Sequence, residues 1–152
     1  MMLTNTAART IVERWFEAFN TGEVDGLPAV HDAACRNHAP GPFDLTAWPD
    51  EGKPFGPDEL AATIAWIRTN QQDLHIDIEH VLVEDDQAVA WIRATATPKG
   101  FGPIPATGSR VDFHQAHRFR IRDGKVVEHW AVRDDLRSML QSGVLSTPGP
   151  RS

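Results

Sequence analysis

The stretch that decides the fold is VDFHQAHRFRIRDGKVVEHWAVRD, residues 111–134, in which apolar and polar residues alternate on both sides of a tight turn. Asp123-Gly124 is the turn signal, because glycine tolerates positive φ and aspartate can bond its own backbone. The pattern therefore predicts a β-hairpin. One face of its first strand collects Val111, Phe113, Gln115, His117, Phe119 and Ile121. Burying an amide and an imidazole is costly unless both are hydrogen-bonded or meet a ligand, so Gln115 and His117 indicate a pocket.

Length and composition predict a single folded domain. The chain has 152 residues, of which 41% are hydrophobic and 24% charged, which is enough for a sizeable core. We expect the domain over residues 1–145 and a loose tail, STPGPRS, over residues 146–152. The formal net charge of −6 argues against nucleic acid as the main partner, because phosphate binding needs clustered lysine and arginine.

Cysteine usage and hydropathy indicate the compartment. Cys35 is the only cysteine, so an intrachain disulfide is excluded and a small buried hydrophobe is its expected role. Residues 1–10 lack the apolar segment of a signal peptide, and no run reaches transmembrane length. We therefore expect a cytoplasmic protein that does not contact a membrane.

Apolar residues at three- and four-residue steps predict two long helices. The first runs from a cap at Asn5 or Thr6 to about Asn20. The second begins at Pro57, since proline is favoured at an early helical position, and it ends near Gln71. Shorter helices are expected over residues 23–31 and from residue 134 or 135 to residue 143.

Three further strands are predicted from alternation with a period of two, over residues 34–38, 74–83 and 88–97. One face of the middle strand is expected to carry Leu74, Ile76, Ile78, His80 and Leu82. Helices followed by a run of strands predict an α+β fold, in which one curved, mostly antiparallel sheet wraps around the N-terminal helices. The space between helix and sheet is the natural place for a cavity.

Two segments rich in proline and glycine interrupt these elements, at residues 37–56 and 98–109. The first is long for a loop in a compact domain and carries Phe43, Trp48 and Phe55. These aromatic residues favour a lid or pocket rim over simple disorder.

Short motifs follow one another along most of the chain. They are Asn37-His38, Asp73-Leu74-His75-Ile76, Pro105-Ala106-Thr107-Gly108, Gln115-Ala116-His117-Arg118-Phe119, Asp123-Gly124-Lys125-Val126-Val127-Glu128-His129-Trp130, Asp134 and Gln141-Ser142-Gly143. In this order and spacing they resemble the SnoaL-like polyketide cyclase family of the nuclear transport factor 2-like superfamily. The resemblance implies a cone-shaped α+β barrel with a central pocket for a small hydrophobic carbonyl compound, no cofactor, and a homodimer or homotetramer.

The resemblance also implies a site. In the cyclases an acid/base pair promotes intramolecular aldol closure of a polyketide ester. The family's paired strand residues match Gln115 and His117, whereas the position of its acid/base aspartate holds Ala131. An alanine cannot move a proton, which leaves two hypotheses. The protein is an acid/base enzyme for cyclisation or a related isomerisation, dehydration or ring opening, or it is a non-catalytic small-molecule-binding protein.

Four residues are candidates for catalysis. His117 has an ordinary pKa near neutrality and suits acid/base work, or it is a core histidine satisfied by a backbone carbonyl. Gln115 either polarises a substrate carbonyl or fixes the tautomer of His117. His129, on the strand face of Ala131, and His38, at the start of the expected lid, are candidates for the second proton carrier. The alternative for both is an ordinary surface histidine.

The remaining candidates concern binding. Asn37 is expected to hydrogen-bond a ligand oxygen, and Asp134 either orients a histidine or caps the last helix. Four aromatic residues form the core or line an apolar cavity: Trp15, Phe16, Trp91 and Phe113. No metal site is expected, because His114 and His117 lie three apart on a strand and point to opposite faces.

Overall fold

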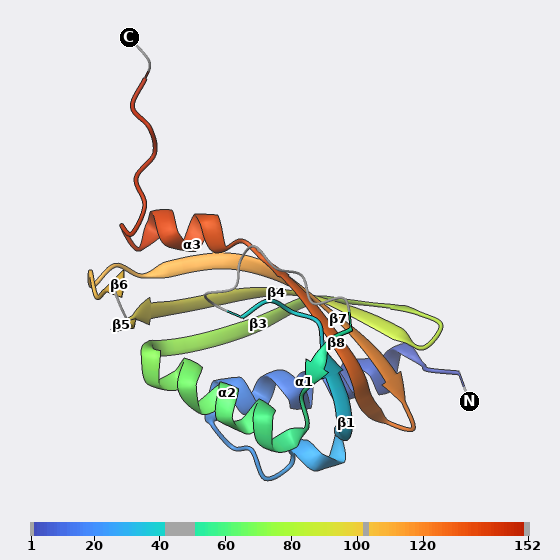
Figure 1. Ribbon diagram of the computed structural model, residues 1–152. Helices are drawn as coiled ribbons and strands as arrows, with labels where there is room; N and C mark the ends of the chain where they lie inside the picture. The colour runs from blue at the N-terminus through green and yellow to red at the C-terminus, as the bar shows by residue number, and fades with distance from the viewer. Residues whose placement is uncertain (1, 42–50, 102–103, 151–152) are drawn as a thin grey trace.

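The computed structural model describes residues 2–41, 51–101 and 104–150, and Figure 1 shows them arranged around one curved sheet. In chain order the elements are α1 (Asn5–Thr21), the 3₁₀ turn η1 (Leu27–Ala29), β1 (His31–Asn37), β2 (Lys53–Pro54), α2 (Pro57–Asn70), β3 (Gln71–Glu84), β4 (Gln87–Pro98), β5 (Gly100–Phe101), β6 (Ile104–Pro105), β7 (Val111–Arg122), β8 (Lys125–Arg133) and α3 (Asp135–Gln141). The predicted α+β class is confirmed.

Six strands form the main sheet in the order β2-β1-β8-β7-β4-β3, and β5 and β6 form a separate hairpin. Neighbours in the main sheet are antiparallel except β1 and β8, which run parallel. The sheet is curved and not closed, with α1 and α2 on one side and α3 on the other (Figure 1). The side that packs against α1 is called the inner face below, and the opposite side the outer face.

Helix α1 supplies most of the aromatic core. Thr4 caps its start by accepting a hydrogen bond from the Ala7 N–H at 3.1 Å, and Gly22 ends it in the left-handed conformation at φ 81°. The stripe predicted from the spacing is buried: Ala8, Ile11, Val12, Trp15, Phe16, Ala18 and Phe19. Both ends of this helix lie within two residues of the prediction.

The hairpin of residues 111–134 forms as predicted, as β7 and β8. At its turn Asp123 and Gly124 adopt φ values of 50° and 75°, the left-handed region that such two-residue turns require. Its inner face buries Val111, His117, Phe119, Ile121, Val126, His129 and Ala131. The imidazole rings of His117 and His129 are therefore enclosed in a largely apolar layer.

Strand β3 departs from the prediction at a bulge. Its register with β4 shifts between Ile78 and His80, and a slip of one residue exchanges the two faces of a strand. After the bulge Val81 and Val83 pack against the core. The prediction that His80 and Leu82 share one face with Leu74, Ile76 and Ile78 is wrong, because both are exposed whereas Ile76 is buried.

The predicted lid, residues 37–56, lies partly outside the described residues, which omit 42–50 together with Phe43 and Trp48. Its far end is described. Arg36 donates to the carbonyls of Glu51 and Gly52 at 3.0 and 2.7 Å, and β2 pairs with β1. The end of the segment is thereby held beside β1.

Two shorter predictions are revised. The predicted helix over residues 23–31 is the single turn η1, and β1 begins already at His31. The segment 98–109 contains the short strands β5 and β6. None of the described helices is long and apolar enough to cross a membrane.

Candidate acid/base site

Four polar side chains join end to end on the inner face, and we call them the acid/base chain: Gln115, His117, His129 and Asn37. The side-chain oxygen of Gln115 lies 2.7 Å from Nε2 of His117. Nδ1 of His117 lies 2.9 Å from Nε2 of His129, and Nδ1 of His129 lies 2.8 Å from Oδ1 of Asn37. All four residues are candidates in the sequence, and the structure brings them together.

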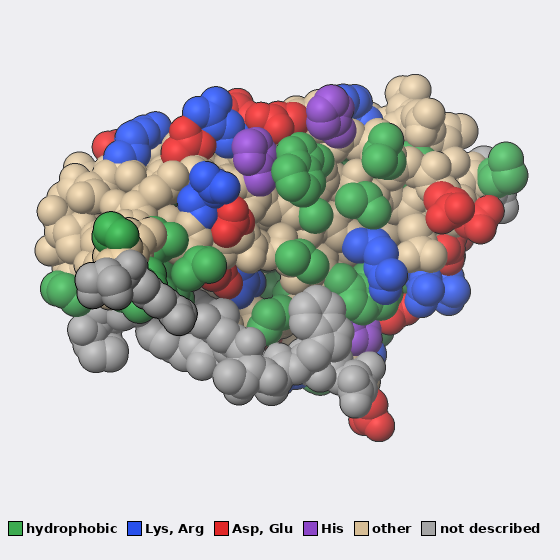
Figure 2. Space-filling model, turned by 90° about the horizontal axis from the view of Figure 1, so that it is seen from above, with side chains coloured by type: hydrophobic (Ala, Val, Ile, Leu, Met, Phe, Trp, Pro, Cys, Tyr) green, Lys and Arg blue, Asp and Glu red, His purple; other side chains and the backbone are tan. Residues whose placement is uncertain are grey.

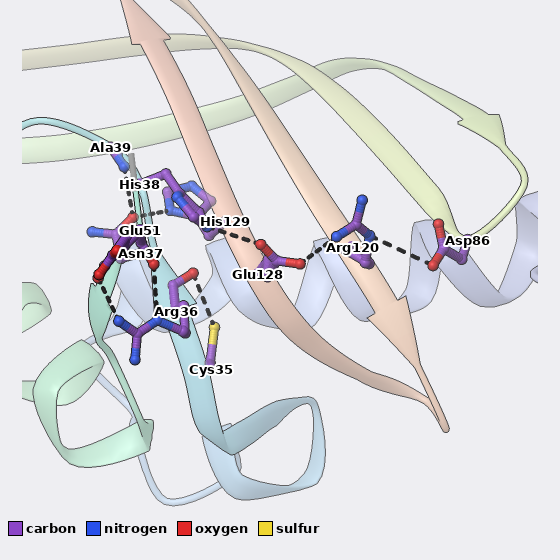
Figure 3. Close-up of polar contacts among 11 residues, drawn as sticks. Cys35, Arg36, Asn37, His38, Ala39, Glu51, Asp86, Arg120, Glu128 and His129 are labelled. Carbon is purple, nitrogen blue, oxygen red and sulfur yellow. Dashed lines mark hydrogen bonds and ion pairs between the residues drawn. The ribbon is translucent and has the colours of Figure 1, made fainter. Parts of the chain in front are cut away.

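Strand register places these side chains. Gln115 and His117 are two apart on β7 and share its inner face. His129 follows on β8, where Ala131 lies directly opposite His117. The parallel pairing of β1 with β8 then sets Asn37 beside His129. Figure 3 shows Asn37 and His129 meeting from these two strands.

Aromatic rings surround the two histidines. The ring of Phe16 meets that of His117 edge-on at 5.1 Å between centroids, and the ring of Trp15 lies 5.1 Å from that of His129. The ring of Phe119 lies near both imidazoles, at 5.3 Å from His129 and 6.2 Å from His117 between ring centroids. The interior next to these histidines is thus apolar, and it disfavours charge.

Burial keeps both imidazoles neutral. It lowers the pKa of His117 to about 3, with a further lowering by the positive charge of Arg133. The pKa of His129 is also held well below its ordinary value, first by burial and then by repulsion from His117. Near neutral pH each ring therefore carries a single N–H and a single lone pair.

Counting protons fixes the tautomers. Two neutral rings supply two N–H groups for the three hydrogen bonds of the acid/base chain. Asn37 Oδ1 also accepts the Ala39 N–H at 3.1 Å, so its oxygen is fixed toward His129 and takes that ring's Nδ1–H. His117 then donates its Nδ1–H to His129. Nε2 of His117 retains the lone pair, and the Gln115 amide, whose ends exchange by a half-turn, satisfies it through an N–H.

His31 is a buried histidine that the sequence analysis did not select. Its Nδ1 accepts the Trp15 indole N–H at 3.2 Å, and its Nε2–H donates to the Phe55 carbonyl at 2.6 Å. Burial lowers its pKa although Phe55, Asp32 and Glu59 oppose this. Both ring nitrogens are occupied, so His31 joins α1 to β1 and the end of the 37–56 segment.

His38 points away from the acid/base chain. Its Nε2 lies 2.9 Å from Glu128, and its ring stacks on Trp130 at 4.6 Å. Glu128 also pairs with Arg120, which lies 3.6 Å from Asp86, so the contacts run along the outer face (Figure 3). Burial alone would raise the pKa of Glu128, but hydrogen bonds from His38 and Arg120 lower it.

Two other candidates also lie outside the acid/base chain. Trp91 is 43% exposed on the outer face and stacks on His114 at 5.2 Å, so it does not belong to the core, which was one of the two alternatives for this residue. Asp134 caps α3 by accepting the Arg137 N–H and pairs with the Arg137 side chain. Phe113 is half-buried against the core, as expected.

The described residues line at least two hollows. One of about 690 Å³ opens on the outer face around Trp91, His114 and Val132. The other, about 450 Å³, lies between α1 and η1. Figure 2 shows the molecule from above, with hydrophobic side chains gathered in the middle of this face and histidines and charged groups around them.

The described part of the chain offers neither a reactive thiol nor a group of side chains that could hold a metal ion. Burial raises the pKa of Cys35 to about 12, so it stays a thiol and a poor nucleophile. Within residues 2–41, 51–101 and 104–150, no three histidine, cysteine or acidic side chains are grouped to hold a metal ion. The acid/base chain is the arrangement in these residues that suits proton transfer.

Fold and site together define a small α+β protein of the nuclear transport factor 2-like class, with a neutral histidine pair on the inner face of its sheet. The chain belongs to the SnoaL-like polyketide cyclase family, whose sequence model matches residues 9–142.

Two cyclases are similar to the chain over most of its length. Aklanonic acid methyl ester cyclase DnrD of Streptomyces peucetius is 28% identical over 139 residues, which are 88% of each chain. Aklanonic acid methyl ester cyclase DauD of Streptomyces sp. strain C5 is 29% identical over 141 residues, covering 88% of this chain and 80% of DauD. Family and relatives support a cyclase-type function.

Solved structures show the same fold. TsrD from Streptomyces laurentii superposes with a TM-score of 0.77 at 25% identity, covering 94% of this chain and 99% of TsrD. IdmH from Streptomyces antibioticus, a putative polyketide cyclase, superposes with a TM-score of 0.73 at 23% identity, covering 89% of this chain and 97% of IdmH.

Proposed function

We propose that the protein is a cofactor-independent acid/base enzyme that cyclises a hydrophobic, carbonyl-bearing metabolite of the polyketide type, with His117 as its base. The acid/base chain is the observation that carries this proposal. It presents an uncharged imidazole whose Nε2 lone pair points toward half-buried Gln115, with a second imidazole behind it. Membership of the cyclase family and the two cyclase relatives support the same class of reaction.

The proposed reaction begins when a carbon acid of the substrate replaces the Gln115 amide at Nε2 of His117. Nε2 removes a proton from a carbon next to a carbonyl group, and the electron pair of that C–H bond becomes an enolate. The released Gln115 amide donates an N–H to the enolate oxygen. The enolate carbon attacks a second carbonyl of the same molecule, which forms a carbon–carbon bond and an alkoxide. The imidazolium returns its proton to that alkoxide.

His129 shares the charge while His117 holds the proton. The Nδ1 proton of the imidazolium can move along the 2.9 Å hydrogen bond to His129, whose own Nδ1–H donates to Asn37. The positive charge is thereby spread over two rings. Because the pKa of His117 is about 3 without a ligand, the proton is held only while the enolate anion lies beside it.

Turnover of aklanonic acid methyl ester is the first experiment, with the product followed by chromatography and mass spectrometry. His117→Ala should lower kcat/KM by about 10²–10⁴-fold, the usual contribution of a general base. His75→Ala is the matched control, because that side chain is 58% exposed and lies outside the acid/base chain, so its kcat/KM should not change. Undiminished turnover by folded His117→Ala would contradict the assignment.

A second candidate function is ligand binding without chemistry, and Ala131 favours it. This residue is 3% exposed and lies opposite His117, at the position where the resemblance implies the family's acid/base aspartate. The variant Ala131→Asp discriminates between an acid/base enzyme and a protein that only binds the ligand. Cyclisation that appears only in this variant would indicate a decayed enzyme, whereas ligand recovered unchanged from both proteins would indicate a binding protein.

A further inference from the structure

The outer face of the sheet carries a continuous group of apolar side chains, which we call the outer patch. Strand register aligns Trp91, Ala116 and Val132 in one row across β4, β7 and β8, and Leu82 with Val89 in the next row. Trp91, Val132 and Leu82 are 43%, 66% and 69% exposed. Single exposed apolar side chains are ordinary, but a continuous patch of them with a polar surround marks an interaction site.

The face around the outer patch is large enough for a protein–protein interface. It spans β3, β4, β7 and β8, and β4 and β7 are each 12 residues long. With about 4.8 Å between strands and about 3.3 Å per residue, it measures roughly 20 Å by 40 Å. A standard interface buries about 800 Å² on each partner. Helix α3 is bound through Gln141 to Asp112, near the start of β7, and leaves the patch exposed.

A carboxylate lies on one side of the outer patch. Glu79 reaches across β4 from β3, and its carboxylate lies 3.1 Å from Nε2 of His114 on β7. Two other carboxylates line the same hollow, and each is paired with an arginine: Asp112 with Arg93, and Asp134 with Arg137. Within the described part of the chain, Glu79 has no arginine or lysine as a partner.

A cation lies on the other side of the outer patch. Arg118 follows Ala116 by two residues on β7, just as His114 precedes it by two, so all three share the outer face. Arg118 is exposed, and its guanidinium carbon lies 3.8 Å from the centre of the Trp130 ring. It forms no ion pair with the residues that the structure describes. A carboxylate and a cation without ionic partners therefore flank the patch at equal spacing.

We propose that the outer patch is an interface with a second copy of this chain. The two-fold axis would lie in the interface and cross the strands at the row of Trp91, Ala116 and Val132. It sets β7 of one copy on β7 of the other in the opposite direction, so Arg118 of each copy faces Glu79 of its partner. The surface is thus complementary to itself, apolar in the middle and of opposite charge at the two ends. This self-complementarity favours a second copy over an unrelated protein.

Charge reversal tests the pairing, with the mass in solution measured by light scattering after size exclusion. The wild-type protein should have about twice the chain mass of 16.9 kDa. Arg118→Glu sets carboxylate against carboxylate at both ends, and Glu79→Arg sets guanidinium against guanidinium. Each variant alone should raise the Kd of the dimer at least about a hundredfold. An equimolar mixture of the two variants restores opposite charges at both ends and should return to the dimer mass.

Further variants control for folding and for charge. Arg9→Glu makes the same change of charge at a side chain 48% exposed on α1, on the other side of the sheet, and should stay dimeric. Val132→Asp places a charge in the middle of the outer patch and should raise the Kd at least about tenfold. If circular dichroism shows that a charge reversal misfolds, Arg118→Gln and Glu79→Gln replace it, and each should raise the Kd about fivefold or more.

Three results would overturn the proposal: a wild-type protein that stays monomeric at millimolar concentration, a dimer that survives both folded charge reversals, or folded variants that stay monomeric when mixed. The proposed function is tested separately, because none of these measurements depends on turnover.

Discussion

Nδ1 of His117 lies 2.9 Å from Nε2 of His129, and the two rings are 5.1 Å apart between centroids at an interplanar angle of 25°. Two ionisable groups this close titrate as a pair, because a proton on one ring disfavours a proton on the other. The two histidines are therefore one titrating unit, and the pKa values of the pair depend on what lies at each of its ends.

Asn37 controls the far end of the pair. Asn37→Asp would place a carboxylate against Nδ1 of His129, and an anion there should raise the pKa of both histidines. The measurement is an NMR titration of the imidazole signals, together with the acid limb of the activity–pH profile, which should move to higher pH. Asn37→Ala should lower activity without that shift, and unmoved imidazole titrations in Asn37→Asp would contradict the hydrogen-bonded chain.

The free energy of unfolding should fall as the pH is lowered. Burial lowers the pKa of His31, His117 and His129 in the folded protein below the value of 6.5 expected when unfolded. The unfolded chain then takes up protons that the folded one excludes, so stability is fully present above pH 6.5 and is lost below it. For His117, with a folded pKa of about 3, the loss at pH 5 is roughly 2 kcal/mol.

Urea denaturation at neutral pH and near pH 5 measures this loss. His75→Ala should leave the difference between the two conditions unchanged, because that side chain is exposed. Equal stability at the two pH values would show that the buried histidines accept protons in the folded state.

Trp15→Phe should destabilise the fold through His31. The phenyl ring retains most of the aromatic volume but removes the indole N–H that His31 Nδ1 accepts. A buried acceptor left unpaired costs about 1–3 kcal/mol, which denaturant unfolding can measure. Trp91→Phe, at a position 43% exposed on the outer face, is the matched control and should cost about 0.5 kcal/mol or less. Similar losses in the two variants would contradict a specific role for the indole N–H.

Gly52→Ala and Gly108→Ala should differ in cost although both glycines adopt positive φ, 71° and 77°. A Cβ at Gly52 would lie 2.9 Å from Cε1 of His38, whereas one at Gly108 would have no atom within 4 Å. Both variants carry a backbone strain of about 1 kcal/mol, and only Gly52→Ala must also displace the His38 ring from Glu128 and Trp130. Thermal unfolding should therefore show the lower melting temperature for Gly52→Ala.

Local pattern was enough to predict much of the acid/base chain. Alternation with a period of two places Gln115 beside His117, and the turn at Asp123-Gly124 returns His129 on the adjacent strand. Each of these relationships joins residues of the same hairpin, β7 and β8. For that reason the hairpin and the polar pair could be predicted from the sequence.

The other features of the fold and the site depend on pairing between strands that are far apart in the sequence. Asn37 is 92 residues from His129, and the parallel pairing that joins them leaves no local signal in the sequence. Trp91 lies on the outer face and outside the core, because the alternation along β4 separates its two faces but does not say which of them meets the helices. The bulge in β3 also leaves no signal in the sequence, since apolar residues keep a period of two on both sides of His80.

The parallel contact between β1 and β8 has a consequence for synthesis of the chain. Asn37 leaves the ribosome early, but the strand that carries His129 is among the last elements to emerge. Closing so distant a contact is slow, because the intervening chain must first be ordered. A nascent or truncated chain that ends before β8 therefore has no histidine pair. Under the proposed function, cyclisation should therefore begin only after β8 has paired with β1 and β7, and its recovery would follow refolding of the chain.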